Sequence, residues 1–304
     1  MEERKWSVYF QNPEYLEMTR MFMIPKDMIP LVRRWCGLKD GMKVLDVGAG
    51  TGYFTRLLAS GPEKVTVTGL DLDDNFVSYA RQKASDLGLS VDFVLGNALA
   101  LPFADSSFDL VTSHTFFTSI PDPVKAMAEM QRVLRPGGTV VSVTPMSYDN
   151  FVYDPGRYPE DCEWATTYEN LHVQFYEACF AIDSFESRTA GVDPALVPRF
   201  FADSGLKRIC VYPLAKAISL SYAALPPEEK LRYVDLYQQA EEKHLEAFMA
   251  LPEMAEHFTR EQADEFLRLL RAKCAWHRDH LNENTVWDWV GSGNLLVTGV
   301  WEET

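Results

Sequence analysis

The sequence predicts a doubly wound α/β fold, and three observations carry that prediction. Apolar runs rich in β-branched residues alternate with helical patterns from residue 43 to residue 145. A glycine-rich turn, Asp46-Val-Gly-Ala-Gly-Thr-Gly52, directly follows the first of these runs. The segment Asn294–Trp301 alternates as a closing antiparallel strand does. We therefore expect a mostly parallel seven-stranded sheet with an antiparallel last strand and helical insertions.

The predicted strands are short apolar segments, each followed by turn or helix-start residues. They are Lys43–Val47, Val65–Leu70, Val91–Leu95, Phe108–Ser113, Thr139–Thr144, Lys207–Pro213 and Asn294–Trp301. Asp122 before Pro123 fits an N-cap followed by proline, and Pro136-Gly137-Gly138 should end that helix before the fifth strand. Another helix is expected at Asp193–Ser204, just ahead of the sixth strand.

Two insertions interrupt the alternation and give the expected domain organisation. Residues 148–191 are rich in aromatic and acidic side chains with weak periodicity, whereas residues 221–292 are strongly helical and contain a capping box at Thr259–Gln262. Because both insertions leave the sheet where a substrate should enter, we expect them to form a lid. Residues 1–40 are expected to form an N-terminal helical cap. The α/β domain then comprises residues 41–147, 192–220 and 293–304.

Composition excludes several classes of function. The formal net charge of −15 over 304 residues disfavours nucleic acid as a partner, since Lys and Arg supply most affinity for phosphate backbones. The five cysteines lack the spacing of a disulfide framework or a zinc site, so we expect no metal. No apolar stretch is long enough to span a membrane. We therefore expect a cytoplasmic monomer or homodimer whose partner is a small molecule.

The glycine-rich turn points to a nucleoside ligand. Its three glycines let the backbone turn sharply and approach a ligand closely. About twenty residues later, Asp71 ends the second strand, where a carboxylate can accept hydrogen bonds from both hydroxyls of a ribose. A dinucleotide fingerprint would place its third glycine at position 53, which is Tyr53 here. This spacing disfavours a nicotinamide-dependent dehydrogenase.

Four further segments accompany the turn in order along the chain. They are Gly69-Leu-Asp71, Gly96-Asn-Ala98, Leu101-Pro-Phe103 through Ser107-Phe-Asp109, and Val133-Leu-Arg-Pro-Gly-Gly138. With these segments the chain resembles the class I S-adenosylmethionine-dependent methyltransferases, most closely their small-molecule, ubiquinone/menaquinone-biosynthesis-like branch. The resemblance is close over residues 40 to 145 and looser over residues 194 to 213 and the last strand. It implies a Rossmann-like fold that binds S-adenosylmethionine.

The resemblance also implies roles for individual residues. The loop residues Gly48, Ala49, Gly50 and Gly52 would contact the methionine part of the cofactor, with Asp46 behind them. Asp71 would take the ribose, Leu72 would flank the adenine, and Asn97 would accept from the adenine amino group through its carbonyl oxygen. The family often has an acid at the position of Asn97. The remaining expected cofactor contacts are Ala98 and His114.

Catalysis of methyl transfer requires no protein nucleophile, because the methyl carbon is already activated and the enzyme mainly holds both reactants in line. A general base is needed only for a hydroxyl or a protonated amine. The candidates for this base are His114, Tyr148, Asp149 and His172. An ordinary hydrogen-bonded histidine is an equally good interpretation of His114. Phe108 and Asp109 are expected to be architectural, and His277 to complete a packed helix face.

The function that the sequence predicts is methyl transfer from S-adenosylmethionine to a small-molecule acceptor, with the acceptor atom left open. Two alternatives use the same cofactor. The first is methylation of a protein side chain, which an open acidic groove would favour over an enclosed pocket. The second is noncatalytic binding of S-adenosylmethionine, because cofactor residues alone do not prove turnover.

Overall fold

The computed structural model describes residues 6–9, 11–24, 26–145, 151–153, 164–182, 191–218, 226–281 and 289–302. The chain divides into two compact units. The sheet unit comprises Thr19–Asp149, Arg188–Lys216 and Ser292–Thr304. The helical unit comprises Met1–Met18, Asn150–Ser187 and Ala217–Gly291.

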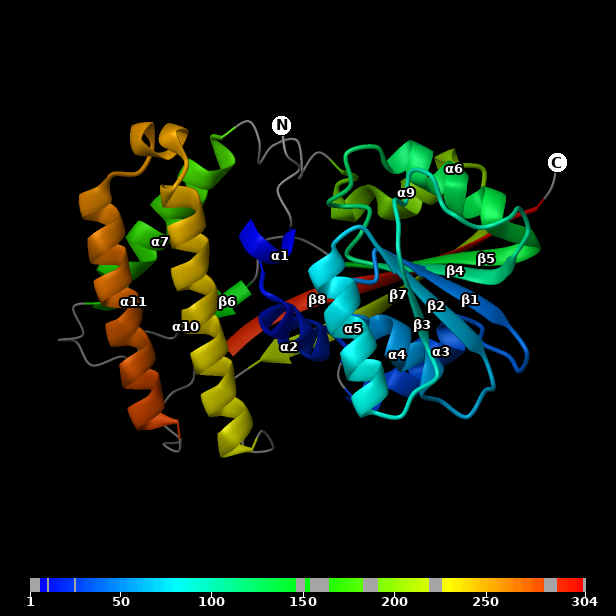
Figure 1. The fold of residues 1–304 in the computed structure, drawn as a ribbon, viewed down its shortest axis with the longest axis horizontal. Coiled ribbons are helices and arrows are strands. Elements are labelled where there is room, and N and C mark those ends of the chain that lie inside the picture. Colours follow the sequence, from blue (N-terminus) through cyan, green and yellow to red (C-terminus); the bar gives the residue numbers. More distant parts are fainter. Residues whose placement is uncertain are drawn as a thin grey trace. The chain divides into compact units, whose positions relative to one another are not determined.

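The sheet has the strand order β3-β2-β1-β4-β5-β8-β6, with β7 paired to β8 (Figure 1). Its strands are β1 Lys43–Val47, β2 Thr66–Asp71, β3 Asp92–Leu95, β4 Phe108–His114, β5 Leu134–Pro145, β6 Phe151–Tyr153, β7 Lys207–Ile218 and β8 Trp289–Val300. The first five strands in this order pair in parallel, and β8 runs antiparallel to β5. The predicted mostly parallel sheet with an antiparallel last strand is thus confirmed.

The short strand β6 is an addition that the sequence did not predict. It pairs antiparallel with Trp289–Gly291, the part of β8 that belongs to the helical unit. Three residues are too few to show the period-2 alternation from which strands are recognised. The sequence prediction therefore missed this strand.

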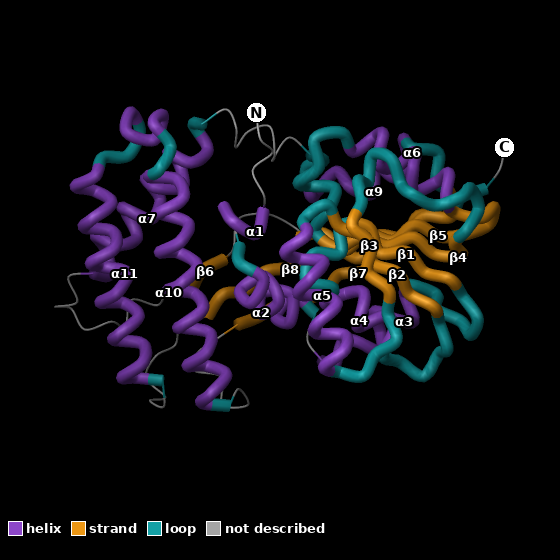
Figure 2. Tube along the Cα trace, viewed as in Figure 1, coloured by secondary structure: helices purple, strands orange, loops and turns teal. Residues whose placement is uncertain are grey.

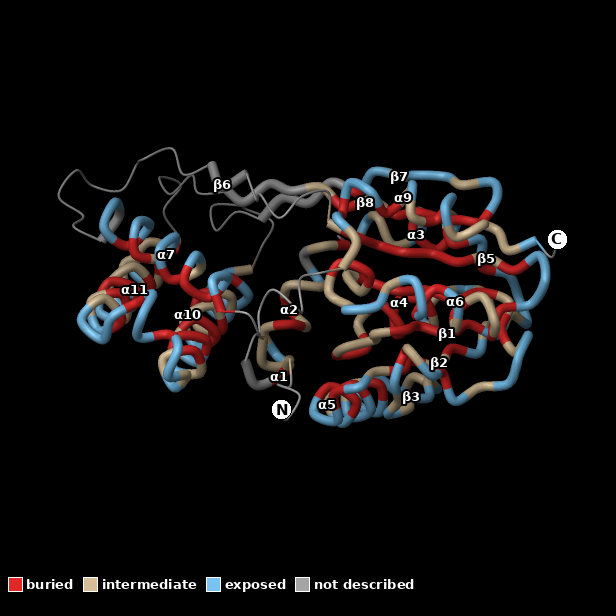
Figure 3. The backbone as a smooth tube through the Cα atoms, turned by 90° about the horizontal axis from the view of Figure 1, so that it is seen from above, coloured by how far each residue is buried: buried red, intermediate tan, exposed pale blue. Residues whose placement is uncertain are grey.

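Two apolar clusters cover the two faces of the sheet, which makes the fold doubly wound. Successive residues of a strand point to opposite faces. Accordingly, Leu45 and Val47 pack in one cluster with Met127 of α6, and Val44 packs in the other with Leu58 of α4. Figure 2 shows helices on both sides of these strands, and Figure 3 colours much of β1 and β5 as buried. The helices of the sheet unit are α3 Ile29–Trp35, α4 Tyr53–Ala59, α5 Asp74–Asp86, α6 Pro123–Val133 and α9 Val197–Asp203, with the single turns η1 Lys26–Met28 and η2 Pro194–Leu196.

Helix α6 begins at the predicted cap, but the strand that follows it begins earlier than predicted. Asp122 caps its start, because the carboxylate accepts from the Lys125 backbone N–H at 2.9 Å, as predicted. The helix ends at Val133, and β5 begins immediately at Leu134, five residues before the predicted start at Thr139. Proline at 136 disfavours helical backbone at the residue before it, so the chain is already extended ahead of the two glycines.

The helical unit is built around one aromatic-rich core. Its helices are α1 Trp6–Tyr9, α7 Trp164–Phe180, α10 Pro227–Met249 and α11 Arg260–His280, with the turn η3 Pro252–Glu256, and α2 Pro13–Met23 begins in this unit. Helices α7 and α10 both pack against α11, and the buried rings of Phe175, Phe248 and Phe266 meet in the core. Thr259 and Gln262 form the predicted capping box, and His277 is buried in the packed face of α11 as predicted. Within the described part of the chain, no helix has the length and apolarity needed to cross a membrane.

Candidate functional site

Backbone N–H groups of the loop after β1 form hydrogen bonds to the end of β2. The N–H groups of Gly48 and Ala49 both donate to the Leu70 carbonyl oxygen at 2.9 Å, and the Gly50 N–H donates to Asp71 Oδ2 at 2.7 Å. Residues 48, 50 and 52 all have positive φ angles of 54° to 76°, a conformation that favours glycine. The structure thus brings the predicted glycine loop and the predicted acid into direct contact.

Neighbouring rings leave no room for side chains at two of these glycines. A Cβ atom at Gly48 would lie 2.5 Å from Phe116 Cδ2, and one at Gly52 would lie 2.5 Å from Phe93 Cζ. Both distances are far below van der Waals contact. The sequence motif identified the glycines. The two phenylalanine rings that exclude side chains at these positions come from other strands and loops, so no local signal in the sequence predicts these contacts.

Asp71 has hydrogen-bonding capacity left for a ligand. Its Oδ1 accepts from the Asp73 N–H at 2.9 Å and its Oδ2 from Gly50, yet each carboxylate oxygen can accept more than one bond. Burial raises the pKa of Asp71 to about 6, while the backbone donors lower it. Next to it, the side chain of Leu72 is 53% exposed and so free to contact an apolar ring.

Asp46 lies behind the loop as a fully buried carboxylate. It is 1% exposed, and its two oxygens accept from the hydroxyls of Thr55 at 2.6 Å and Thr112 at 3.0 Å. Burial raises the pKa of Asp46 to about 7, although both threonines lower it. Sequence reasoning missed both threonines. Thr112 reaches Asp46 only through the pairing of β1 with β4.

Replacing Asp46 with asparagine is expected to change how stability depends on pH. The native state holds this proton more tightly than the unfolded chain, whose carboxyl has the ordinary value of 3.8. The ionisation of Asp46 therefore costs stability as the pH rises from about 4 to about 7. Over that window, the free energy of unfolding of Asp46→Asn, measured in urea, should rise relative to wild type by on the order of 1–4 kcal/mol. A difference that stays constant with pH would contradict the buried, proton-binding carboxylate.

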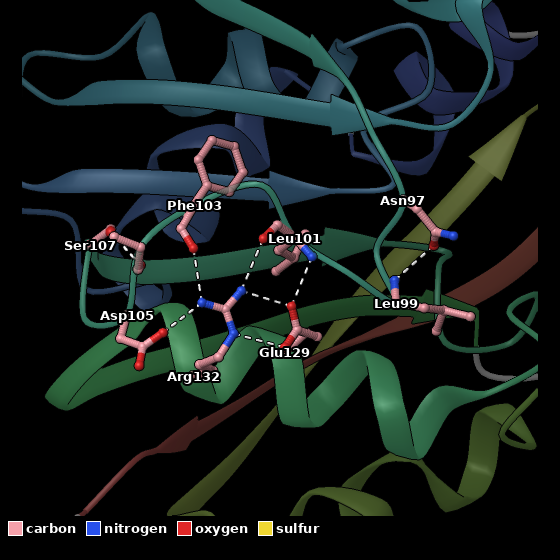
Figure 4. A network of polar contacts seen from close by, with 9 residues as sticks. Asn97, Leu99, Leu101, Phe103, Asp105, Ser107, Glu129 and Arg132 are labelled. Carbon is pink, nitrogen blue, oxygen red and sulfur yellow. Dashed lines mark hydrogen bonds and ion pairs between the residues drawn. The ribbon is translucent and has the colours of Figure 1, made fainter.

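The connection after β3 carries Asn97 and Ala98, and a polar network braces it (Figure 4). Asn97 is exposed, and its Oδ1 already accepts from the Leu99 N–H at 2.8 Å, closing a local turn. Further along, Arg132 of α6 donates to the carbonyl oxygens of Leu101 at 3.0 Å and Phe103 at 2.9 Å. Arg132 also pairs with Glu129, whose carboxylate accepts from the Leu101 N–H at 2.8 Å. Helix α6 therefore fixes the backbone that follows Asn97.

Removing the Arg132 guanidinium should loosen this connection. We expect Arg132→Met to lower the free energy of unfolding by about 1–3 kcal/mol, because two carbonyl oxygens and Glu129 lose a donor. It should also weaken binding of the expected S-adenosyl cofactor severalfold, measured by calorimetry with its demethylated form, S-adenosylhomocysteine. The matched control is Arg199→Met, whose exposed ion pair with Asp203 contributes at most about 0.5 kcal/mol. If both variants were equally stable, the Arg132 network would not stabilise the connection after β3.

The predicted catalytic residues lie in different parts of the chain. His114 ends β4 and is 6% exposed, and its ring is tilted against Phe54 with centroids 5.5 Å apart. His172 lies on α7 in the helical unit. Tyr148 and Asp149 lie outside the described residues. The roles of all four stay predictions.

Other sequence expectations concern metals, thiols and architecture. No group of three or more His, Cys, Asp or Glu side chains among the described residues is placed to hold a metal ion. The described cysteines, Cys36, Cys179, Cys210 and Cys274, are free thiols. Asp109 is architectural as predicted, because its Oδ2 accepts from the Lys43 N–H at 2.7 Å and so joins the starts of β4 and β1.

Comparisons with known proteins agree with this geometry. Residues 45–142 match the methyltransferase domain family. Demethylmenaquinone methyltransferases of Bacillus cereus and Bacillus anthracis are each 30% identical to this chain over 195 residues, which is 64% of this chain and 81% of theirs. Among solved structures, the YcgJ protein of Bacillus subtilis matches with a TM-score of 0.52 and 21% identity, covering 92% of this chain and all of its own. The BH2331 protein of Bacillus halodurans matches with a TM-score of 0.51 and 17% identity, covering 91% and 100%.

Proposed function

Since the chain belongs to the class I S-adenosylmethionine-dependent methyltransferases of the quinone-biosynthesis-like kind, we propose that this enzyme methylates a small-molecule acceptor. The relatives with 30% identity are named for demethylmenaquinone, which is a small molecule. The net charge of −15 supports an acceptor other than nucleic acid. The observation that carries the proposal is the contact of the glycine loop with Asp71, because a carboxylate that could accept from ribose hydroxyls lies beside a backbone that a ligand can approach closely.

The residues on both sides of this contact fit the cofactor. We propose that Asp71 accepts from the ribose hydroxyls, that Leu72 covers one face of the adenine, and that Gly48, Ala49, Gly50 and Gly52 leave room for the methionine part. Asp46 then stabilises the loop from behind through Thr55, which lies on α4. Asn97 and Ala98 follow the end of β3 and are proposed to border the adenine. The Asn97 carbonyl oxygen has a second lone pair beside its bond to Leu99.

When bound, the cofactor supplies a methyl carbon already activated by its sulfonium. The protein then has to hold the acceptor in line with that carbon and to keep water away. We propose that His114 lines this region, because it ends β4 and parallel α/β sheets place ligands beyond the carboxyl ends of their strands. Tyr148, Asp149 and His172 remain proposed proton acceptors, and the two insertions remain a proposed lid.

Incubation with methyl-labelled S-adenosylmethionine tests this function. The purified enzyme is added to a bacterial extract that has been separated into a filtrate of small metabolites and a retained protein fraction. We expect label to move into the filtrate. Label in the protein fraction would favour methylation of a protein side chain, and retention of unreacted cofactor with no transfer would favour noncatalytic binding.

A further inference from the structure

The helical unit contains a buried carboxylate with an incomplete set of partners. Glu241 of α10 is 5% exposed. Its Oε1 accepts from the Tyr176 hydroxyl at 3.1 Å. Its Oε2 is shielded from solvent and has no hydrogen-bond partner among the described residues, and it lies 3.7 Å from His172 Nε2. A buried carboxylate oxygen without a donor is costly, so its presence calls for an explanation.

Aromatic side chains surround this carboxylate. Tyr168, His172 and Tyr176 are spaced by four residues along α7 and so share one helix face, with centroid distances of 5.6 Å and 4.7 Å between successive rings. The Tyr168 hydroxyl bonds that of Tyr237, on the same helix as Glu241, at 2.7 Å. We call Glu241, Tyr168, His172, Tyr176 and Tyr237 the Glu241 cluster. The side chain of His172 remains 30% exposed, so the cluster is not sealed from solvent.

The charge of Glu241 is not neutralised within the cluster. Burial lowers the pKa of both His172 and His244 to about 4, so both rings are neutral at pH 7. Lys273 of α11 contributes a nearby positive charge, but its Nζ bonds Glu169 Oε1 at 3.0 Å. Burial raises the pKa of Glu241 to about 7, although the Tyr176 hydroxyl and Lys273 lower it. Around neutral pH the cluster therefore alternates between a protonated and an ionised carboxyl group.

The same lysine already lies over one of these rings. Lys273 Nζ lies 4.4 Å from the centroid of the Tyr168 ring, which is a cation–π contact. Aromatic faces next to a carboxylate are the combination with which proteins recognise ammonium groups. A neutral ligand would leave the carboxylate charge uncompensated, whereas a cation would stabilise the ionised form.

We propose that the Glu241 cluster binds an organic amine in its protonated form, with the ammonium group donating to Glu241 Oε2 and the apolar substituent lying against the tyrosine rings. Amine binding here is a function beyond methyl transfer, and the bound amine need not be the methyl acceptor.

Calorimetry with benzylamine and its neutral analogue benzyl alcohol tests the proposal on the full chain at pH 7. We expect benzylamine to bind at least about tenfold more tightly, because only the amine compensates the carboxylate charge. Binding should also release a fraction of a proton, because the ammonium group favours ionised Glu241. The release is measured by comparing binding heats in phosphate and Tris buffers, whose ionisation heats differ.

Variants show which residue causes the preference for the amine and the proton release. Glu241→Gln should abolish both the preference for the amine and the proton release. Glu242→Gln alters the next residue, which pairs with Arg271, and should keep both. The far-ultraviolet circular dichroism spectrum and urea unfolding of Glu241→Gln check that the helical unit is folded, and S-adenosylhomocysteine binding reports on the cofactor site separately. Should Glu241→Gln fail to fold, Tyr176→Phe removes only the donor to Oε1, so it should keep the amine preference and release more protons at pH 7.

Three results would overturn the proposal. The first is equal affinity of the wild-type enzyme for benzylamine and benzyl alcohol, and the second is no binding of benzylamine. The third is an unchanged amine preference in Glu241→Gln. Methyl transfer is measured separately with labelled cofactor, so failure of amine binding and failure of methyl transfer are distinguishable.

Discussion

Asp71→Ala should weaken the binding of S-adenosylhomocysteine by about 100-fold or more. The variant removes a carboxylate that would accept two hydrogen bonds from the ribose, and bonds to a charged group contribute about 1.5–3 kcal/mol each. It also removes the partner of the Gly50 N–H, so the glycine loop loses one of its ties to β2. Titration calorimetry of the purified chain measures the dissociation constant.

Asp92→Ala is the matched control for this prediction. Asp92 begins β3, three residues before Leu95, which pairs with Asp71, so it lies toward the opposite end of the same strand pair. Its removal should leave the affinity unchanged within about twofold, since its side chain is exposed and it pairs with Thr68, three residues before Asp71. If Asp71→Ala retained wild-type affinity while remaining folded, the assignment of Asp71 to the ribose would be wrong.

Gly48→Ala should combine a loss of stability with a loss of cofactor affinity. Left-handed backbone costs a residue with a Cβ about 1–2 kcal/mol. The new methyl group would also lie 2.5 Å from Phe116 Cδ2, and displacing a packed ring costs about 1–3 kcal/mol. We therefore expect the free energy of unfolding in urea to fall by about 2–5 kcal/mol. S-adenosylhomocysteine should bind more than about tenfold more weakly, because the added methyl group narrows the space left for the ligand.

Gly88→Ala separates the cost of left-handed backbone from the cost of the clash with Phe116. Gly88 also has a positive φ of 63°, but a Cβ atom added there would meet no atom within 4 Å beyond its chain neighbours. Its replacement should cost only the backbone part, about 1–2 kcal/mol, and leave cofactor binding intact. In the double variant with Phe116→Ala, Gly48→Ala should cost no more than Gly88→Ala. If Gly48→Ala and Gly88→Ala behaved alike as single changes, the close approach of Phe116 would have no energetic consequence.

Short-range patterns made much of the sheet unit predictable. The bounds of β1 match the prediction at both ends, because a buried β-branched run meets a glycine turn that cannot continue the strand. The caps at Asp122 and Thr259 also form as predicted, since an N-cap side chain reaches a backbone N–H only two or three residues away. The glycine loop and Asp71 were predictable for the same reason, as each follows the end of its own strand.

Contacts between distant segments could not be predicted in this way. Thr112 reaches Asp46 across 66 residues, and Arg132 reaches Leu101 across 31, so neither leaves a periodic signal. Asn97 was assigned to the adenine from the family pattern, and only the structure shows its carbonyl oxygen also closing a turn at Leu99. The partly unpaired carboxylate of Glu241 likewise depends on the packing of α7 against α10, which a single sequence does not encode locally.

A crystal structure of the chain with S-adenosylhomocysteine is the most direct test of the account. We predict that the ribose hydroxyls lie about 2.5–3.0 Å from the Asp71 carboxylate oxygens, with the homocysteine part along the glycine loop. Electron density for the ligand at another place, or a ribose held by other residues, would contradict it.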